Sequence, residues 1–283
     1  MSKLNSNYLG WDTENHLLEF DSWNQKCNLD FNYTYGCFYE QKYLLSAIRN
    51  SENPKIVDIG CATGTTFRYL QNQLGDSGYS YTGVDLSSHV IKKARSLYPN
   101  ADFIESTGEE IIKVLGSKSD IVYSRDLVLH QEDPYKFLDQ LIEITDKFLI
   151  IRLRTRDKGE TEYNISKSCQ MHYDLYWMPY IVLSIDELIS YFKSKDNVAK
   201  ISINKSYEVL GGQNNRFLPK DLYFKETGAA ETSIMIEFNS DNSELNLEIV
   251  NDKDIQGREF LKMNKWSLKN LTYRLMSKVA LKI

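Results

Sequence analysis

The sequence predicts an α/β protein in which a mostly parallel sheet carries helices on both faces. Strand-like and helix-like segments alternate over residues 54–153, which is the pattern of right-handed βαβ units. The apolar strand Lys55–Ile59 is followed by a glycine loop, Gly60–Gly64, and then directly by a helix-like segment. A second strand, Tyr81–Val84, ends at Asp85, 25 residues after the first glycine of the loop. We interpret this arrangement as a nucleoside pocket, because glycine permits close approach of the backbone and a carboxylate accepts hydrogen bonds from ribose hydroxyls.

The spacing of the glycines narrows the class of ligand. Dinucleotide-binding folds use Gly-x-Gly-x-x-Gly, which places helix N–H groups against a pyrophosphate. In this loop the middle glycine is absent, and Cys61 and Ala62 occupy the space. The loop therefore favours a nucleoside ligand without a pyrophosphate. An enzyme that uses NAD or a nucleotide sugar is a weaker interpretation.

The run Asp58–Gly64, with Asp85 at the expected distance, resembles motif I and the ribose-binding acid of the class I S-adenosylmethionine-dependent methyltransferases. Residues 101–110 resemble the third strand and adenine loop of that family, and residues 120–130 resemble its fourth strand and the loop beyond. The resemblance implies a Rossmann-like sheet of seven strands, of which the last is antiparallel. It also implies S-adenosyl-L-methionine as the cofactor.

The rest of the sheet is predicted from hydrophobic patterning. The apolar run 148–153 indicates a buried fifth strand. A helix is expected to begin at Ser184, with Glu187 three residues later completing a capping box. Alternating residues over 200–210 and 231–238 predict two more strands. These segments match the last two strands of the family in outline.

Three regions follow from these segments. Residues 1–51 are rich in aromatic residues and are interpreted as an N-terminal cap or lid, with packing on the sheet edge as the alternative; a helix is expected over 40–49. Residues 52–240 form the predicted methyltransferase domain, and a polar and aromatic insertion, 154–183, lies on its substrate side. Residues 241–283 form a C-terminal basic tail.

The resemblance places the cofactor-binding residues in the glycine loop and at the ends of the second, third and fourth strands. They are Asp58, Gly60, Cys61, Ala62, Gly64, Asp85, Leu86, Thr107, Gly108, Ser124 and Arg125. Asp85 is expected to bind the ribose, and Leu86 to cover the adenine. Asp58 is expected to orient the ammonium group of the cofactor, with a structural role in holding the loop as the alternative.

Two histidines are candidates for the group that removes a proton from the methyl acceptor. His130 follows the fourth strand, and an imidazole with an ordinary pKa of about 6.5 can accept a hydroxyl proton at neutral pH. His172, in the insertion, is the second candidate. The alternative for His130 is packing or capping of its loop, and His16 and His89 are interpreted as surface or packing residues.

The substrate-binding candidates lie beyond the fifth strand. Arg152, Arg154 and Arg156 alternate, so their side chains share one face of an extended strand and suit a phosphate or carboxylate. Pairing with nearby acidic residues is the alternative. Tyr173 and Tyr176 belong to an aromatic cluster in the insertion that suits a sugar or another polar small molecule, or that packs as a second hydrophobic cluster.

From these features we predict an S-adenosylmethionine-dependent methyltransferase that acts on a small polar, anionic acceptor: a phosphate, a carboxylate or a sugar derivative. Methylation of oxygen is favoured over nitrogen. Ser124–Leu127 stands where some nitrogen methyltransferases carry Asn/Asp-Pro-Pro-Tyr/Phe, which argues against methylation of DNA amines and leaves small amines open. The alternative from another class is a catalytically inactive nucleoside-binding module that acts through a partner.

Composition restricts the other function classes. Hydrophobic and charged fractions of 42% and 26% are ordinary for a soluble globular protein. The sequence lacks an apolar run long enough to span a membrane, a signal-peptide pattern and paired metal-binding cysteines, so we expect a cytoplasmic protein without a metal site.

The tail is basic although the whole chain is acidic. Residues 257–283 carry seven basic residues and one acidic residue, whereas the net charge of the chain is −5. An acidic main body argues against binding of nucleic acid. In the tail Leu261, Leu268, Leu271, Leu275 and Val279 recur at helical spacing, which predicts a basic amphipathic helix. Docking on the main body, on a partner or on a membrane surface are three open interpretations.

Overall fold

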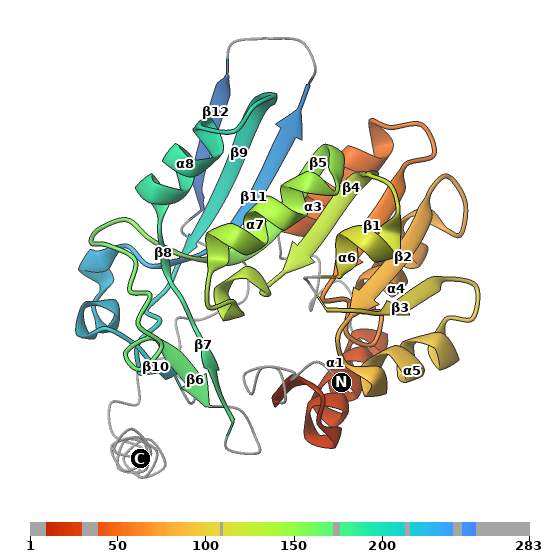
Figure 1. Cartoon of the computed structure of the whole chain (residues 1–283), viewed down its shortest axis with the longest axis horizontal. Coiled ribbons are helices and arrows are strands. Elements are labelled where there is room, and N and C mark those ends of the chain that lie inside the picture. Colours follow the sequence, from red (N-terminus) through yellow and green to blue (C-terminus); the bar gives the residue numbers. More distant parts are fainter. Residues whose placement is uncertain are drawn as a thin grey trace.

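The structure of the protein is a computed structural model that describes residues 10–29, 39–107, 110–171, 176–212, 216–239 and 245–252 (Figure 1). Its centre is a sheet with the strand order β12-β9-β11-β5-β4-β1-β2-β3, and the short β8 pairs with β5 beside this path. The predicted α/β class is confirmed, because helices cover both faces of this sheet.

Five parallel strands form the half of the sheet that begins at β3. They are β1 (Lys55–Ile59), β2 (Ser80–Asp85), β3 (Asp102–Glu105), β4 (Ser119–Arg125) and β5 (Thr145–Arg156). Each agrees with a predicted strand, although β5 continues three residues past the predicted end. After β3 the chain returns past β1, and β4 pairs with the side of β1 that faces away from β2. The direction in which strands are added to the sheet therefore reverses between β1 and β4. The segments that follow β1 and β4 lead to helices on opposite faces of the sheet, α4 and α7, and open α/β sheets bind ligands at such a point.

The other half of the sheet contains the predicted antiparallel strand. Strand β11 (Ala230–Phe238) lies between β5 and β9 (Val198–Tyr207) and is antiparallel to both. The predicted seven strands are therefore present, and two more join them. Strand β8 (Leu183–Ser184) pairs with β5, and β12 (Asn246–Asp252) pairs in parallel with β9 at the sheet edge.

Strand β12 lies inside the region predicted as a tail, so the sheet extends beyond residue 240. The predicted amphipathic helix over 257–283 lies outside the described residues, and its role stays a prediction.

The α-helices divide between the two faces of the sheet. The elements are α1 (Glu14–Leu29), α3 (Tyr39–Arg49), α4 (Thr65–Leu74), α5 (Ser88–Leu97), α6 (Ile111–Leu115), α7 (Pro134–Glu143) and α8 (Ile185–Lys193), with 3-10 turns η2 (Val128–His130), η3 (Lys220–Tyr223) and η4 (Lys225–Thr227). Helices α3, α4 and α5 pack on one face, and α6, α7 and α8 pack on the other. Strand β5 serves both cores by alternation, because Ile151 faces the α7 side and Ile150 faces the α3 side.

Helix α8 begins at the predicted residue, but without the predicted capping box. Ser184 is the N-cap residue, yet its side chain makes no capping hydrogen bond. The Thr161 hydroxyl donates to the Glu187 carboxylate over 2.6 Å, and the Ser184 N–H donates to the Thr161 hydroxyl oxygen over 2.9 Å. A tertiary contact with the preceding loop thus replaces the local cap.

The insertion after β5 is partly a small antiparallel sheet. Strands β6 (Cys169–Met171), β7 (Trp177–Pro179) and β10 (Arg216–Phe217) pair in the order β10-β6-β7. In Figure 1 this small sheet and helix α1 both lie below the main sheet, on the side toward which β4 points. Among the residues that the structure describes, no helix is long and apolar enough to cross a membrane.

Two isoleucines that differ in burial test the packing of the sheet. Ile151, at the centre of β5, has no exposed surface, whereas Ile249 on the edge strand β12 is 44% exposed. We expect Ile151→Ala to lower the free energy of unfolding by about 2–5 kcal/mol, because it leaves a cavity. Ile249→Ala is the matched control and should cost about 1 kcal/mol or less. Urea denaturation measures both, and similar losses for the two variants would contradict the assigned core.

Candidate functional site

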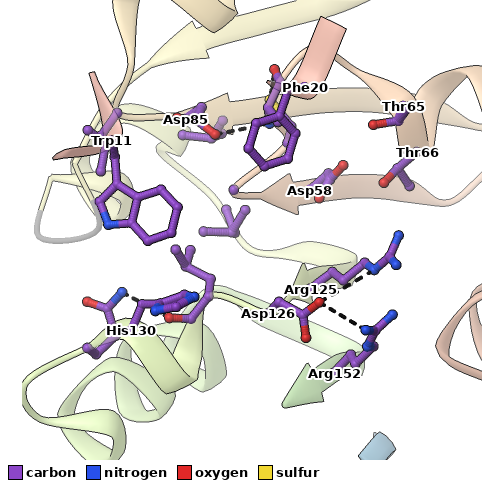
Figure 2. Close-up of a pocket in the computed structure, with 18 of the residues that line it drawn as sticks. Trp11, Phe20, Asp58, Thr65, Thr66, Asp85, Arg125, Asp126, His130 and Arg152 are labelled. Carbon is purple, nitrogen blue, oxygen red and sulfur yellow. Dashed lines mark hydrogen bonds and ion pairs between the residues drawn. The ribbon is translucent and has the colours of Figure 1, made fainter. Parts of the chain in front are cut away.

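A cavity of about 540 Å³ lies at the carboxyl ends of β1, β2, β4 and β5, and its volume is typical of a small-molecule site. Its walls are the glycine loop, the residues that follow β2 and β4, the end of β5, the small sheet and the N-terminal segment. Figure 2 shows the arrangement: Asp58, Asp85, Trp11 and Phe20 border one side, while Asp126, Arg152 and His130 border the other.

The glycine loop is held in left-handed conformations by hydrogen bonds to β2. Gly60 and Gly64 have φ angles of 80° and 84°, and Ala62 between them has φ 47°. The N–H groups of Gly60 and Cys61 donate to the Val84 carbonyl oxygen over 2.8 and 3.1 Å. The conformation of Ala62 directs its N–H to a carboxylate oxygen of Asp85 over 3.0 Å. The loop and the end of β2 therefore form one bonded unit.

Asp85 presents a carboxylate that is already oriented. One oxygen accepts the Ala62 N–H, and the other accepts the Ser87 N–H over 3.0 Å. Burial raises the pKa of Asp85, and these backbone donors lower it in part. Each carboxylate oxygen has two lone pairs, so both oxygens retain an acceptor position. A vicinal diol can use those two positions.

Asp58 is the second carboxylate at this end of the cavity, and it is 1% exposed. The Tyr81 hydroxyl donates to it over 2.7 Å. Burial raises the pKa of Asp58 to about 6, against the effect of the hydrogen bonds from Tyr81 and Thr66. A cationic ligand group beside Asp58 would favour the ionised carboxylate.

The opposite end of the cavity is a network of buried arginines and carboxylates. Arg152 and Arg154 share one face of β5, as predicted, and are 3% and 5% exposed. Arg152 Nη2 lies 3.2 Å from an oxygen of Asp126 and 3.2 Å from an oxygen of Glu231. Arg154 donates to the same two carboxylates, over 2.9 Å each. These contacts agree with the pairing interpretation of the arginines.

Asp126 joins the network to the loop after β4 and borders the cavity between Arg125 and Arg152 (Figure 2). Its φ angle of 56° is left-handed, and its N–H donates to the Arg152 carbonyl oxygen over 2.8 Å. Burial opposes ionisation of Asp126, but Arg152 and Arg154 outweigh that effect and lower its pKa. The carboxylate is therefore charged at neutral pH.

The structure fixes the tautomer of His130, which lines the cavity from turn η2. Its Nδ1 lies 2.8 Å from the Pro179 carbonyl oxygen. A carbonyl oxygen only accepts, so Nδ1 carries the hydrogen, and Nε2 of the neutral ring carries the lone pair. The imidazole packs edge-on against Trp11, with ring centroids 4.8 Å apart, and against Tyr180 at 5.7 Å. This environment gives His130 a proton-accepting nitrogen in a defined orientation.

The N-terminal segment forms one wall of the cavity, and the sequence alone did not identify which of its residues do so. Trp11, His16, Glu19 and Phe20 all line it. His16 is 3% exposed and packs between the rings of Trp11 and Phe20, with centroid distances of 5.1 and 4.5 Å. The aromatic composition of this region was the signal for a cap, and the proposed lid function of 1–51 stays a prediction.

Most of the candidates from the sequence meet in this cavity. The residues that line it are Asp58, Gly60, Cys61, Ala62, Asp85, Leu86, Arg125, His130, Arg152 and Arg154. Gly108, His172 and Tyr173 lie outside the described residues. The binding and catalytic roles assigned to all of these residues stay predictions.

Five candidates are described but do not line the cavity. Gly64 begins helix α4, and Ser106 occupies the wall instead of Thr107. The Ser124 hydroxyl donates to the Ile59 carbonyl oxygen over 3.0 Å, so it joins β4 to β1. The two remaining candidates are Arg156 and Tyr176. Arg156 pairs with Asp221 and donates to the Lys158 carbonyl oxygen, and Tyr176 is 36% exposed.

Other lining residues come from later parts of the chain, and no sequence pattern around them indicates a binding site. Gln170, Glu208, Arg216 and Glu231 line the cavity although none lies near a recognisable motif. In the described ranges, no group of three or more His, Cys, Asp or Glu side chains is placed to hold a metal ion.

Comparison with known sequences identifies the domain. Residues 57–147 match a family model described as a methyltransferase domain. "Putative methyltransferase 235L" of Invertebrate iridescent virus 6 is 34% identical over 99 residues, which are 34% of this chain and 33% of the viral protein. The chain thus spans about a third of the length of this curated relative.

Solved structures agree with the fold. The plantazolicin methyltransferase BamL, solved with a triazolic desmethylPZN analog and SAH, has a TM-score of 0.51 at 16% identity, and the match covers 83% of this chain and 96% of that chain. The N-terminal domain of EvdMO1, solved in the presence of SAH and D-fucose, has a TM-score of 0.52 at 11% identity, over 70% of this chain and 81% of that chain. These structures therefore share the fold of this chain, and residues 57–147 match a methyltransferase-domain model, in agreement with the family that the sequence motifs resemble.

The raised pKa of Asp58 predicts how stability depends on pH. Between the ordinary Asp pKa of 3.8 and about 6, folded Asp58 holds a proton that the unfolded chain has lost. Stability of the wild type therefore falls as pH rises through this window, by about 3 kcal/mol in total. Asp58→Asn removes this titration, so its free energy of unfolding should rise by about 3 kcal/mol relative to wild type between pH 4 and 7.

Urea denaturation at several pH values measures this difference. Asp120→Asn is the control, because the hydrogen bond and charge of Lys147 outweigh desolvation and lower the pKa of Asp120 below 3.8. Most of its effect lies near or below pH 4, so its difference from wild type should change little from pH 4 to 7. An equally flat difference for Asp58→Asn would refute the raised pKa.

Proposed function

We propose that this protein is an S-adenosylmethionine-dependent methyltransferase that methylates a small polar acceptor. One observation carries the proposal: the Ala62 N–H and the Asp85 carboxylate are bonded to each other next to buried Asp58, inside a cavity at the carboxyl ends of β1 and β2. The methyltransferase-domain match over 57–147 includes all three residues.

The residues present fit the cofactor. Asp85 retains an acceptor position on each oxygen, which suits the two ribose hydroxyls. Asp58 offers a buried carboxylate to the cationic methionine part, and Leu86 lines the cavity beside Asp85 and can cover the adenine. The chain offers no second glycine at the position where dinucleotide folds approach a pyrophosphate, so NAD fits the loop less well.

Bound S-adenosylmethionine supplies a methyl group activated by a positively charged sulfur. The task of the protein is then to hold an acceptor nucleophile in line with that group and to remove its proton. We assign proton removal to Nε2 of His130, because the Pro179 carbonyl fixes the Nδ1–H tautomer. Trp11 and Phe20 border the cavity and would exclude water from a bound acceptor.

The acceptor in this proposal is a small polar molecule with a hydroxyl nucleophile and an anionic group. A polar acceptor is supported because the charged and polar side chains of Arg125, Asp126, Gln170 and Arg216 line the cavity. Oxygen is preferred to nitrogen as the nucleophile because Ser124–Leu127 lacks the amine-methylating motif and because a hydroxyl needs the base that His130 provides.

The cofactor assignment predicts the effect of Asp85→Ala. Loss of both ribose acceptors should weaken S-adenosylmethionine binding by about 2–4 kcal/mol, which is about 30-fold to 1000-fold in Kd. Asp102→Ala, on the neighbouring strand β3 and exposed, is the matched control and should bind normally. Titration calorimetry measures both variants, with melting curves to verify folding. Tighter binding of NAD than of S-adenosylmethionine by the wild type would overturn the assignment.

The base assignment predicts the effect of His130→Gln. Turnover should fall by about 10²–10⁴-fold with little change in cofactor affinity. His89→Gln, an exposed histidine paired with Asp12, is the control and should retain activity. Release of the demethylated cofactor from a panel of hydroxylated acceptors gives the rates. Cofactor binding without any turnover would favour the inactive binding module instead, and normal turnover of His130→Gln would remove the histidine from the mechanism.

A further inference from the structure

Four arginines line the cavity, and they differ in whether a carboxylate already holds them. Arg125 Nε lies 3.5 Å from a Glu40 oxygen, and Arg152 and Arg154 contact Asp126 and Glu231. An anionic acceptor at these three guanidinium groups would also face their carboxylates, and like charges in close contact are unfavourable.

Arg216, the fourth arginine, is held in a different way. Its guanidinium carbon lies over the Tyr180 ring, 4.4 Å from the centroid, and Tyr180 is 2% exposed. Within the part of the chain that the structure describes, no carboxylate forms an ion pair with Arg216, and its buried Nε has no hydrogen-bond acceptor. Stacking on a ring uses the face of a guanidinium and leaves the N–H groups at its edge for an anion.

Gln170 adds a neutral donor next to this cation. Arg216 of β10 is directly opposite Gln170 of β6 in the antiparallel pair. Directly opposed residues point to the same face of a sheet, and both side chains line the cavity. A guanidinium and a carboxamide side by side present several N–H donors, which match the two oxygens of a carboxylate.

Tyr180 links this pair to the proposed base. The His130 ring packs edge-on against Tyr180 with centroids 5.7 Å apart, and Arg216 lies over the same tyrosine ring. These two distances, 5.7 Å and 4.4 Å, place the His130 ring and the Arg216 guanidinium carbon no more than about 10 Å apart, which one small molecule with a hydroxyl and an acid group can span.

We propose that Arg216 and Gln170 bind the carboxylate of the methyl acceptor and that the acceptor is a small hydroxycarboxylic acid. This inference rests on the proposed methyltransferase function and names its substrate class. It places the anion-binding site on the small sheet, whereas the sequence alone suggested the arginines of β5. Arg152 and Arg154 then form a neutralised wall behind the acceptor.

A direct binding measurement tests the site without knowledge of the true acceptor. The probes are benzoate and its neutral analogue benzamide, titrated by ligand-observed NMR into the full chain saturated with S-adenosylhomocysteine. We expect benzoate to bind the wild type at least about tenfold more tightly than benzamide, since charge-assisted bidentate bonds are stronger than neutral ones. Arg216→Gln should abolish this preference, Arg216→Lys should retain part of it, and Gln170→Leu should weaken benzoate binding several-fold. Arg49→Gln, at an exposed arginine at the end of α3, is the control and should behave as wild type.

The outcomes separate this inference from the proposed function. Absence of a benzoate preference in the wild type, or its persistence in Arg216→Gln, would overturn the anion site. Should Arg216→Gln fail to fold, Arg216→Lys and Gln170→Leu give the same decision. Affinity for S-adenosylhomocysteine should be unchanged in all variants. If the wild type does not bind S-adenosylhomocysteine, the proposed function fails, and the two probes still test Arg216 on the chain alone.

Discussion

The hydrogen bond from the Ala62 N–H to the Asp85 carboxylate is the contact on which the glycine-loop end of the cavity depends. It requires a left-handed conformation at Ala62, which is unfavourable for a residue with a Cβ atom. The loop tolerates this conformation because the neighbouring N–H groups of Gly60 and Cys61 are bonded to Val84. Strands β1 and β2 are parallel and in register, with Ile59 opposite Val84, so both carboxyl ends open toward the same ligand.

The opposite end of the cavity, beside Arg152 and Arg154, depends on a different constraint: carboxylates must neutralise these buried arginines. A guanidinium remains charged at any physiological pH, so Arg152 and Arg154 need carboxylates when they are removed from water. The sheet register provides one of them, because Glu231 of β11 is directly opposite Arg154 of β5. Glu40 of α3 adds another and accepts a hydrogen bond from the Ser233 hydroxyl over 2.8 Å. The same contacts that neutralise the arginines therefore fasten helix α3 to the sheet and give the cavity a fixed polar wall.

The two ends of the cavity are enclosed by segments that lie far apart in the sequence. The N-terminal segment approaches the small sheet so closely that a Cβ atom at Gly10 would lie 2.9 Å from the Tyr176 Cβ atom. Next to it, Trp11 packs against His130, which is itself bonded to Pro179 at the end of β7. Trp11, His130 and Tyr180 thus form a continuous series of ring contacts, and Arg216 lies over the Tyr180 ring at its end. This packing connects His130 to Arg216.

The sequence by itself determined the parallel half of the sheet and the position of the glycine loop and Asp85 at the carboxyl ends of its strands. Alternating apolar segments, the glycine loop and Asp85 are local signals, and the βαβ rules convert them into one arrangement of strands. The faces of Arg152 and Arg154 were also predictable, because strand alternation has a period of two. Pairing of these arginines with Asp126 was an alternative that the sequence offered, but only the tertiary structure added Glu231 of β11 as a second carboxylate. The tertiary structure likewise decided three other features. They are strand β12, the replacement of the Ser184 cap by a contact with Thr161, and the approach of Trp11, Gln170 and Arg216 to the cavity. Each of these features depends on pairing or packing between residues distant in the chain, and no local pattern in the sequence encodes such contacts.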